Sequence, residues 1–296
     1  MIGELAALGT ALVWSGTYTL FTIAVRAVGP HAVNCARLLI ALLFLMATNW
    51  AMFGEPLPIH AEPARWGWLA LAGVIGFAIS DAMMFGALYR LGAQRSALIK
   101  ALVPVVSTLL AWVSFGETLT GTQILAVFVV VAGILIVLWG PKHTEHTPTT
   151  REYVIGVLFA LGATLTQALR YLFSRQGLAD GFSPLSANTM QILAATVAIW
   201  TFTLIRGGLG KTVAALGDRR GGWATLGGAV TGPFLGVTLS LVALQRAPIG
   251  IASTLMALPP VFLLPLSYVV FKERIGLRAV AGTALATIGV ALIFLA

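Results

Sequence analysis

Charged residues are scarce in this sequence of 296 residues: Asp, Glu, Lys and Arg together make up 9% of it. A soluble globular domain carries about 25% charged residues, because its surface has to be wetted. Hydrophobic residues account for 58% of the chain, and its mean hydropathy is +0.95. The composition therefore excludes an ordinary soluble domain and predicts an integral membrane protein.

Cysteine is almost missing as well, since Cys35 is the only one. A single cysteine excludes an internal disulfide and any site that needs several thiolate ligands. The net charge of +8 comes from Lys and Arg residues between apolar runs, without the basic stripe interleaved with aromatics that indicates nucleic-acid binding. The first apolar run starts at Ile2 without a basic segment before it, so we expect no cleavable signal peptide. We expect neither a metal or other cofactor nor a nucleic-acid partner.

Long apolar runs dominate what is present. A bilayer core is about 30 Å thick, so a helix needs about 20 apolar residues to cross it. A polar, proline-flanked linker at residues 141–152 divides the chain into a first repeat at 1–140 and a second at 153–296. Each repeat holds five such runs, which lie at 3–26, 33–53, 66–89, 96–115, 120–140, 153–175, 185–206, 223–245, 248–271 and 276–296.

The two halves resemble each other in sequence. At one fixed offset Pro104 corresponds to Pro260, and a nearby offset pairs Asn34 with Asn188. Small residues spaced four apart in the third run also have small counterparts in the eighth, and such spacing lets helices approach closely. The remaining pairs are Phe115 with Phe271, Glu117 with Glu273, Gly133 with Gly289, and Ala72, Gly76 and Ser80 with Gly228, Gly232 and Gly236.

An odd number of spans in each half fixes how the halves lie in the membrane. After five crossings the second copy must enter from the opposite side. We therefore expect an all-α integral membrane protein with ten transmembrane helices, arranged as two inverted five-helix repeats around a central cavity. Inverted repeats around a midplane site are a recurring architecture of secondary transporters.

One repeated segment carries a family resemblance. Residues 102–120 combine Pro104 in the fourth run with an apolar helix and then Gly116 and Glu117 before the fifth. This segment resembles the signature of the EamA-type branch of the drug/metabolite transporter (DMT) superfamily. The second copy departs from it with Lys272 in place of glycine, and the segment around Arg37 is similar to the family's second span. The resemblance covers essentially the whole chain. It implies ten helices, a central cavity and transport, often export, of amino acids, other metabolites or drugs.

Four charged residues fall well inside the predicted spans, where each costs about 2.5–3.5 kcal/mol on insertion scales. Arg37, Asp81 and Lys100 lie nearest one membrane face, so Asp81 can pair with either cation, whereas Arg170 lies toward the opposite face. Asp81 is a candidate for proton coupling or for binding a substrate ammonium, and Lys100 or Arg170 for holding a substrate carboxylate. The alternative is that these pairs only fasten helices together, or that the cations extend to the lipid headgroups.

Polar and aromatic residues share helix faces in three spans. The candidate cavity residues are Trp14, Tyr18, Phe77, Asp81, Phe85, Lys100, Gln167, Arg170 and Tyr171. Binding pockets for small molecules are mostly apolar with a few fixed polar groups, which these faces supply; ordinary helix packing is the alternative. Pro104 and Pro260, each inside a span, are the expected hinges, because proline removes a helical hydrogen bond.

The orientation of the chain is left open by two opposing indications. If the termini are cytoplasmic, the inner loops hold Arg65, Arg175 and Arg246, and the other twelve loop cations lie outside. The positive-inside rule therefore predicts that both termini are outside. The family resemblance implies cytoplasmic termini.

The leading hypothesis is a secondary active transporter, an exporter of amino acids or related amphipathic compounds, that works by alternating access in the bacterial inner membrane as a monomer. No Walker A sequence is present, so the chain does not itself use ATP. The alternatives are a carrier for anionic metabolites or cationic drugs, and a membrane-embedded enzyme acting on lipids. We expect no enzyme, because Asp81 is the only carboxylate at membrane depth and all four histidines lie at span ends or in loops.

Overall fold

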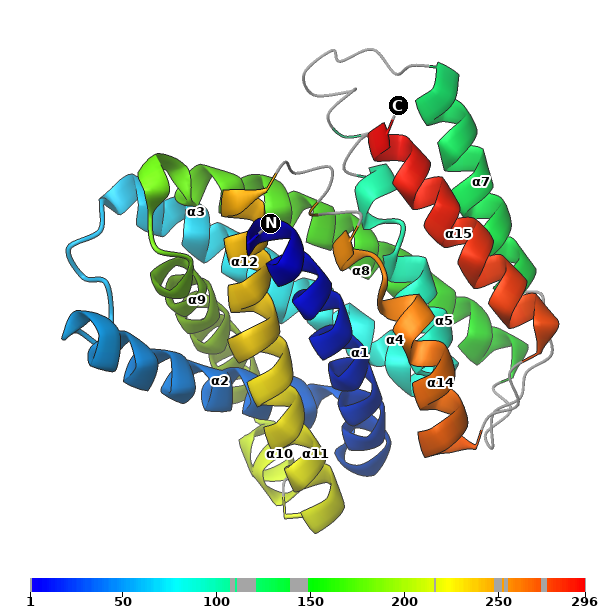
Figure 1. The fold of residues 1–296 in the computed structure, drawn as a ribbon. Coiled ribbons are helices and arrows are strands. Elements are labelled where there is room, and N and C mark those ends of the chain that lie inside the picture. The colour runs from blue at the N-terminus through cyan, green and yellow to red at the C-terminus, as the bar shows by residue number, and fades with distance from the viewer. Residues whose placement is uncertain are drawn as a thin grey trace.

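The computed structural model describes residues 2–106, 110, 121–138, 149–215, 217–247, 252, 255–272 and 276–295, and every regular element within these ranges is helical. Figure 1 shows α1 beginning and α15 ending at the same end of the molecule. The elements are α1 (Ile2–Val28), α2 (Pro30–Phe53), α3 (Pro63–Gly73), η1 (Val74–Ser80), α4 (Asp81–Leu91), α5 (Ala93–Lys100), α7 (Gly121–Leu138), α8 (Thr150–Gly177), η2 (Ala179–Gly181), α9 (Pro184–Ile205), α10 (Leu209–Ala215), α11 (Arg219–Ala229), η3 (Val230–Gly236), α12 (Val237–Arg246), α14 (Pro259–Phe271) and α15 (Leu277–Leu295).

Six helical segments are long and apolar enough to cross a membrane, which agrees with an integral membrane protein. They match six predicted runs to within a few residues and lie at Ile2–Val28, Pro30–Phe53, Pro63–Leu91, Thr150–Gly177, Pro184–Ile205 and Arg219–Arg246. Shorter apolar helices at Ile124–Val137, Pro259–Val270 and Leu277–Leu292 fall in three further predicted runs. The outward surfaces of both the long and the shorter helices carry exposed apolar side chains such as Leu43, Phe128 and Leu158, as a lipid-facing surface requires.

Local sequence sets where several helices start. Proline stands at the first turn of α2, α3 and α9, where its missing N–H is not needed. Thr149 and Glu152 form a capping box at the start of α8, in which the Thr149 side chain accepts from the Glu152 N–H. Gly54 ends α2 with φ 77°, a left-handed conformation that favours glycine.

The third span of each half contains a π-helical segment. In the first half η1 separates α3 from α4, and in the second η3 separates α11 from α12. Asn34 on α2 donates to the Ala78 carbonyl of η1 over 3.4 Å, and Asn188 on α9 donates to the Pro233 carbonyl of η3 over 2.8 Å. Each of the two π-helical segments thus has a backbone carbonyl that accepts a hydrogen bond from an asparagine side chain.

Two predicted spans are interrupted where the sequence predicted continuous helix. The run at 96–115 has a turn at Ala101 and Leu102 after α5, and helix resumes at Val103. The run at 248–271 likewise breaks at Ala257 and Leu258, so α14 begins only at Pro259. Consecutive prolines at 259 and 260 lack two N–H donors and suit a first turn, so they start a helix here. Pro104 and Pro260 thus follow interruptions rather than kinking continuous helices.

Small residues set the closest helix contacts. An added Cβ at Gly133 in α7 would overlap the backbone of α15 at Gly282 and Ala286, so these two helices pack along each other. In the third spans Gly76 lies against Arg170 of α8, and Gly232 lies against Thr17 of α1. The small residues predicted to share one face of each third span therefore let the first helix of the opposite half pack closely against that face. Phe115, Glu117 and Glu273 of the predicted repeat lie outside the described residues.

Candidate functional site

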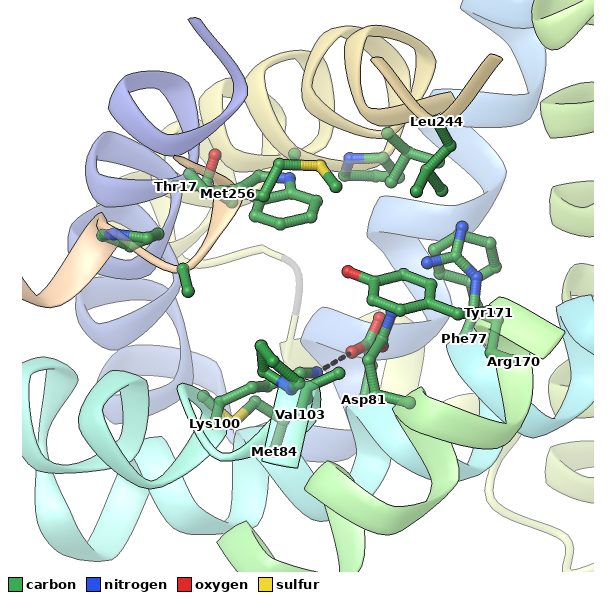
Figure 2. A pocket seen from close by; sticks show the side chains of 18 of the residues that line it. Thr17, Phe77, Asp81, Met84, Lys100, Val103, Arg170, Tyr171, Leu244 and Met256 are labelled. Carbon is green, nitrogen blue, oxygen red and sulfur yellow. Dashed lines mark hydrogen bonds and ion pairs between the residues drawn. The ribbon is translucent and has the colours of Figure 1, made fainter. Parts of the chain in front are cut away.

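A large cavity lies among the helices. It has a volume of about 1300 Å³ and is lined from both halves of the chain, including α1, α4, α5, α8, η3, α12 and α14. Figure 2 shows Asp81 and Lys100 on one side of it, Thr17, Met256 and Leu244 on the other, and Arg170 with Phe77 and Tyr171 at the right of the view. All of the residues predicted for the cavity line it, namely Trp14, Tyr18, Phe77, Asp81, Phe85, Lys100, Gln167, Arg170 and Tyr171, together with Pro104 and Pro260. Their roles in binding and as hinges stay predictions.

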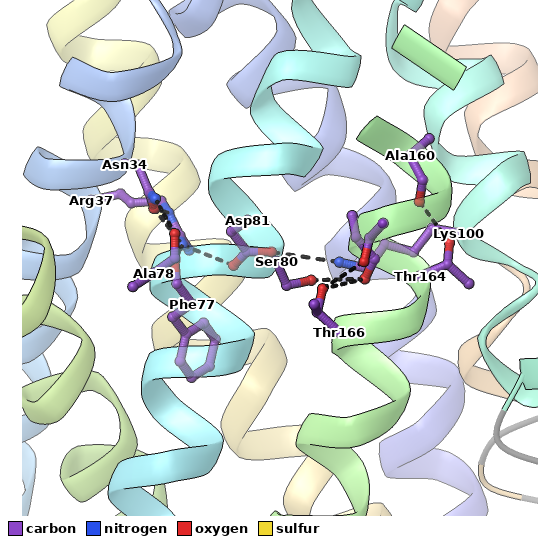
Figure 3. Close-up of polar contacts among 12 residues, drawn as sticks. Asn34, Arg37, Phe77, Ala78, Ser80, Asp81, Lys100, Ala160, Thr164 and Thr166 are labelled. Atoms are coloured by element: carbon purple, nitrogen blue, oxygen red, sulfur yellow. Dashed lines mark hydrogen bonds and ion pairs between the residues drawn. The ribbon is translucent and has the colours of Figure 1, made fainter. Parts of the chain in front are cut away.

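Asp81 lies between two cations. The Arg37 Nη2 donates to the Asp81 Oδ2 over 2.8 Å, and the Lys100 Nζ lies 3.5 Å from the Oδ1. Figure 3 shows the carboxylate bridging α2 and α5. The sequence allowed Asp81 to pair with either Arg37 or Lys100, and in the structure it pairs with both. Each carboxylate oxygen therefore already faces a positive charge.

The Arg37 guanidinium is fixed by several hydrogen bonds. Its Nε and Nη2 donate to the Asn34 Oδ1 over 3.0 and 2.8 Å, and Nη2 also donates to the Phe77 carbonyl over 3.2 Å. Its guanidinium carbon lies 4.9 Å from the ring centroid of Phe85, within cation–π distance. Because its Nε and Nη2 already donate to Asn34, Phe77 and Asp81, Arg37 is better placed to fix Asp81 than to bind a ligand directly.

Arg170 is partnered quite differently. Its guanidinium carbon lies 4.2 Å from the centroid of the Phe77 ring, and its Nε donates to the Gln191 Oε1 over 3.1 Å. Its Nη2 is buried and has no hydrogen-bond partner among the residues that the structure describes. Gly76 leaves the space for the side chain, because an added Cβ there would overlap it. Arg170 was expected toward the opposite face from Asp81, and the structure brings both into the lining of one cavity.

Aromatic side chains fill the walls between the charges. Phe85 packs edge-on against Phe21 with ring centroids 5.0 Å apart, and both are almost fully buried. Tyr18 from α1 and Tyr171 from α8 line the cavity, and Trp14 lies over Gly236 of η3. The wall is therefore largely apolar, with a few fixed polar groups, as small-molecule sites usually are.

Two polar residues with contacts at the site were not among the candidates predicted from the sequence. Gln191 holds Arg170, and Thr17 donates to the Thr231 Oγ1 over 2.9 Å across α1 and η3. Both lie in apolar runs, and the argument from the cost of burial would have found them had it been extended from charged to polar side chains. Within the described ranges, no group of three His, Cys, Asp or Glu side chains gathers as a metal site would require.

Comparison with known proteins adds an independent indication. The EamA-like transporter family matches residues 1–139 and 154–295. The chain is similar to the probable terminal-alkyne amino-acid exporter of Streptantibioticus cattleyicolor, with 24% identity over 196 residues. That match spans 66% of this chain and 59% of the exporter, so well under two thirds of the exporter's length is covered.

The fold is also similar to a solved crystal structure. The superposition has a TM-score of 0.65 and covers 98% of this chain and 94% of the other, with 19% sequence identity. At this identity the likeness concerns the fold alone. The family match and the relative named as an exporter point to a membrane transporter rather than an enzyme.

Proposed function

The chain belongs to the EamA-like transporter family, and we propose that it is a secondary carrier that exports small amphipathic metabolites, amino acids foremost, across the bacterial inner membrane. The observation that carries the proposal is the cavity itself. It is large enough for a small organic molecule, and it combines an aromatic wall with fixed charges of both signs. A carrier for compounds with an apolar body and a charged end needs such a lining.

The proposed architecture is that of two inverted five-helix repeats, at 1–140 and 153–296, joined by the linker at 141–152. Its support is that features recur at corresponding positions of the two halves. The π-helical segments Val74–Ser80 and Val230–Gly236 have the same length and the same place in the sequence pattern. The helix breaks before Pro104 and Pro260 correspond in the same way.

Helix packing supports the same architecture. Gly3 at the start of α1 lies against Arg246 and Ala247, where the third span of the second half ends. Gly156 near the start of α8 lies against Arg90 and Leu91, where the third span of the first half ends. Each half thus packs its first helix on the third span of the other, as a twofold-related pair would. Such a pair already forms a complete cavity, so we propose a functional monomer.

Alternating access is the proposed mechanism. Interrupted helices beside a central site are common in secondary transporters, where rigid parts rock around the substrate. Here the interruptions at Ala101–Leu102 and Ala257–Leu258 lie next to cavity residues Val103 and Pro260. We expect bending at these points to close one end of the cavity and open the other.

Uptake into proteoliposomes tests the proposed function. We expect saturable uptake of a radiolabelled aromatic or branched amino acid that unlabelled substrate competes away, with weaker uptake of a charged amino acid. Two pH gradients should be compared, because Asp81 is the proposed site of proton coupling and is the only carboxylate among the described residues that line the cavity. Absence of uptake for every amino acid would contradict the proposal for this substrate class.

The orientation of the termini gives a further prediction, which rests on the loop charges. Cys35 is the only cysteine, so a Cys35→Ala background accepts single reporter cysteines. Asp180 and Arg220 lie beyond opposite ends of α9, and both are exposed. The charge count predicts that Asp180→Cys reacts with a membrane-impermeant maleimide on intact cells, whereas Arg220→Cys reacts only after permeabilisation. The reverse pattern would place the termini in the cytoplasm.

A further inference from the structure

We infer that the cavity recognises its substrate through a carboxylate, and that an ammonium group on the substrate is dispensable for binding. The inference rests on the proposed function, because it specifies which small amphipathic metabolites the carrier accepts. It follows from the way in which the charged side chains of the cavity are partnered and distributed.

The charges that line the cavity do not balance. Arg37, Lys100 and Arg170 contribute three positive charges to its interior, and Asp81 contributes one negative charge. Arg175 adds a further cation on an exposed part of the lining. In a site that is shielded from water, an uncompensated charge interacts with a ligand far more strongly than it does in bulk solvent. The cavity is therefore short of negative charge, and an anionic ligand supplies it.

Asp81, the one carboxylate among the described residues of the lining, is already occupied. Its Oδ2 accepts from Arg37 at 2.8 Å, and its Oδ1 faces Lys100 at 3.5 Å. A substrate ammonium would have to displace one of these cations or enter as a third positive charge beside them. Asp81 is thus poorly suited to bind an ammonium, and it serves to position Lys100 at the cavity wall.

Arg170 carries the unused hydrogen-bonding capacity. A guanidinium has five N–H donors, and the Gln191 Oε1 takes the one on Nε. The Nη2 of Arg170 and the Nε2 of Gln191 are both buried donors without a partner among the described residues. Buried donors of this kind are normally satisfied, so these two call for an acceptor. A carboxylate suits a guanidinium in particular, because the two groups pair through parallel hydrogen bonds.

The described residues on the opposite side of the cavity are neutral. Under the repeat alignment the charged positions of the first half have uncharged counterparts: Gln191 for Arg37, Val237 for Asp81 and Met256 for Lys100. Thr17 packs on Gly232 as Arg170 packs on the corresponding Gly76. Figure 2 shows Thr17, Met256 and Leu244 across the cavity from Asp81 and Lys100. The cavity therefore has one cationic side and one apolar side, although its architecture is nearly symmetric.

These observations together orient the ligand. Its carboxylate lies at Arg170 and Lys100, and its apolar body extends toward Trp14, Met256 and Leu244. No described group on the apolar side carries the negative charge that an α-ammonium would need. Deaminated or N-acylated relatives of an aromatic amino acid consequently fit at least as well as the amino acid itself.

Four ligands with the same aromatic body test the inference by titration calorimetry on the purified full-length protein. We expect 3-phenyllactate and N-acetylphenylalanine to bind at least as tightly as phenylalanine, and phenethylamine, which has no carboxylate, to bind at least tenfold more weakly. Arg170→Gln should raise the Kd of the carboxylates at least tenfold. Arg151→Gln, which removes an exposed charge from the start of the same helix at a position that does not line the cavity, is the matched control and should change the Kd less than threefold. If Arg170→Gln fails to fold, the order of the four Kd values on the unmodified protein still tests the inference.

The outcomes separate the inference from the proposed function. Tighter binding of phenylalanine or phenethylamine than of the two anions would overturn the inference and leave a carrier of small amphipathic metabolites standing. Binding of none of the four would remove both the inference and the proposed substrate class.

Discussion

Replacing Asp81 by Asn is expected to lower the free energy of unfolding by about 3–5 kcal/mol, the range found when one partner of a buried ion pair is removed. Asparagine keeps the shape of the side chain but leaves Arg37, which is 2% exposed, and Lys100, which is 14% exposed, without a counter-charge. Two uncompensated cations then lie 3.5 Å or less from a neutral amide. Thermal unfolding of the protein in detergent measures the loss.

The matched control is Asp180→Asn. Asp180 also faces an arginine, since its Oδ2 lies 3.6 Å from Arg65, but its side chain is 86% exposed. Exposed pairs contribute about 0–1 kcal/mol, so this variant should unfold close to the unmodified protein. Equal stability of the two variants would show that Asp81 does not neutralise its neighbours.

A double variant separates charge balance from a general packing defect. Asp81→Asn combined with Lys100→Met removes one anion and one cation, so of the two cations beside residue 81 only Arg37 is left without a counter-charge. We expect the double variant to recover part of the lost stability, which a packing defect would not allow.

The Asp81→Asn variant also tests proton coupling. Uptake by a folded Asp81→Asn protein that keeps its rate and its pH profile would exclude Asp81 from coupling.

The sequence predicted the long spans well because lipid imposes a single requirement on them. A run must be apolar and about 20 residues long, and the six long helical segments end within a few residues of the predicted runs. Asp81 and Lys100 could be singled out for the same reason, since a charge inside a span stands out against apolar neighbours. Hydropathy thus identifies both the membrane helices and the unusual residues within them.

What the sequence did not reveal depends on backbone geometry and on packing between distant segments. The π-helical turns η1 and η3 leave no mark in hydropathy, and the break at Ala257–Leu258 lies within an apolar run. The approach of Arg170 to Phe77 needs α8 to pack on η1 at Gly76. Apolar composition shows that a segment lies in the membrane, but it does not show whether its helix is continuous or which neighbour it meets.

Replacing Gly73 by Ala is expected to cost about 1–3 kcal/mol of unfolding free energy, the usual range for overpacking a buried contact. Gly73 is the last residue of α3, and an added Cβ would overlap the backbone of Gln191 in α9. Backbone atoms cannot rotate aside as a side chain can, so α9 itself has to shift. Gly67→Ala is the control on the same helix, because its Cβ would meet no atom within 4 Å.

The two alanine variants should therefore differ in stability. In an open helical position, alanine gains about 0.5–1 kcal/mol over glycine through its lower conformational entropy in the unfolded chain, so Gly67→Ala should be neutral or stabilised. Gly73→Ala should also weaken carboxylate binding, because the residue that it displaces, Gln191, holds Arg170 through a 3.1 Å hydrogen bond. Thermal unfolding together with calorimetry of 3-phenyllactate measures both effects. If Gly73→Ala matched Gly67→Ala in both, α3 and α9 would not approach as closely as the structure has them, and the support for Arg170 from Gln191 would have to be abandoned.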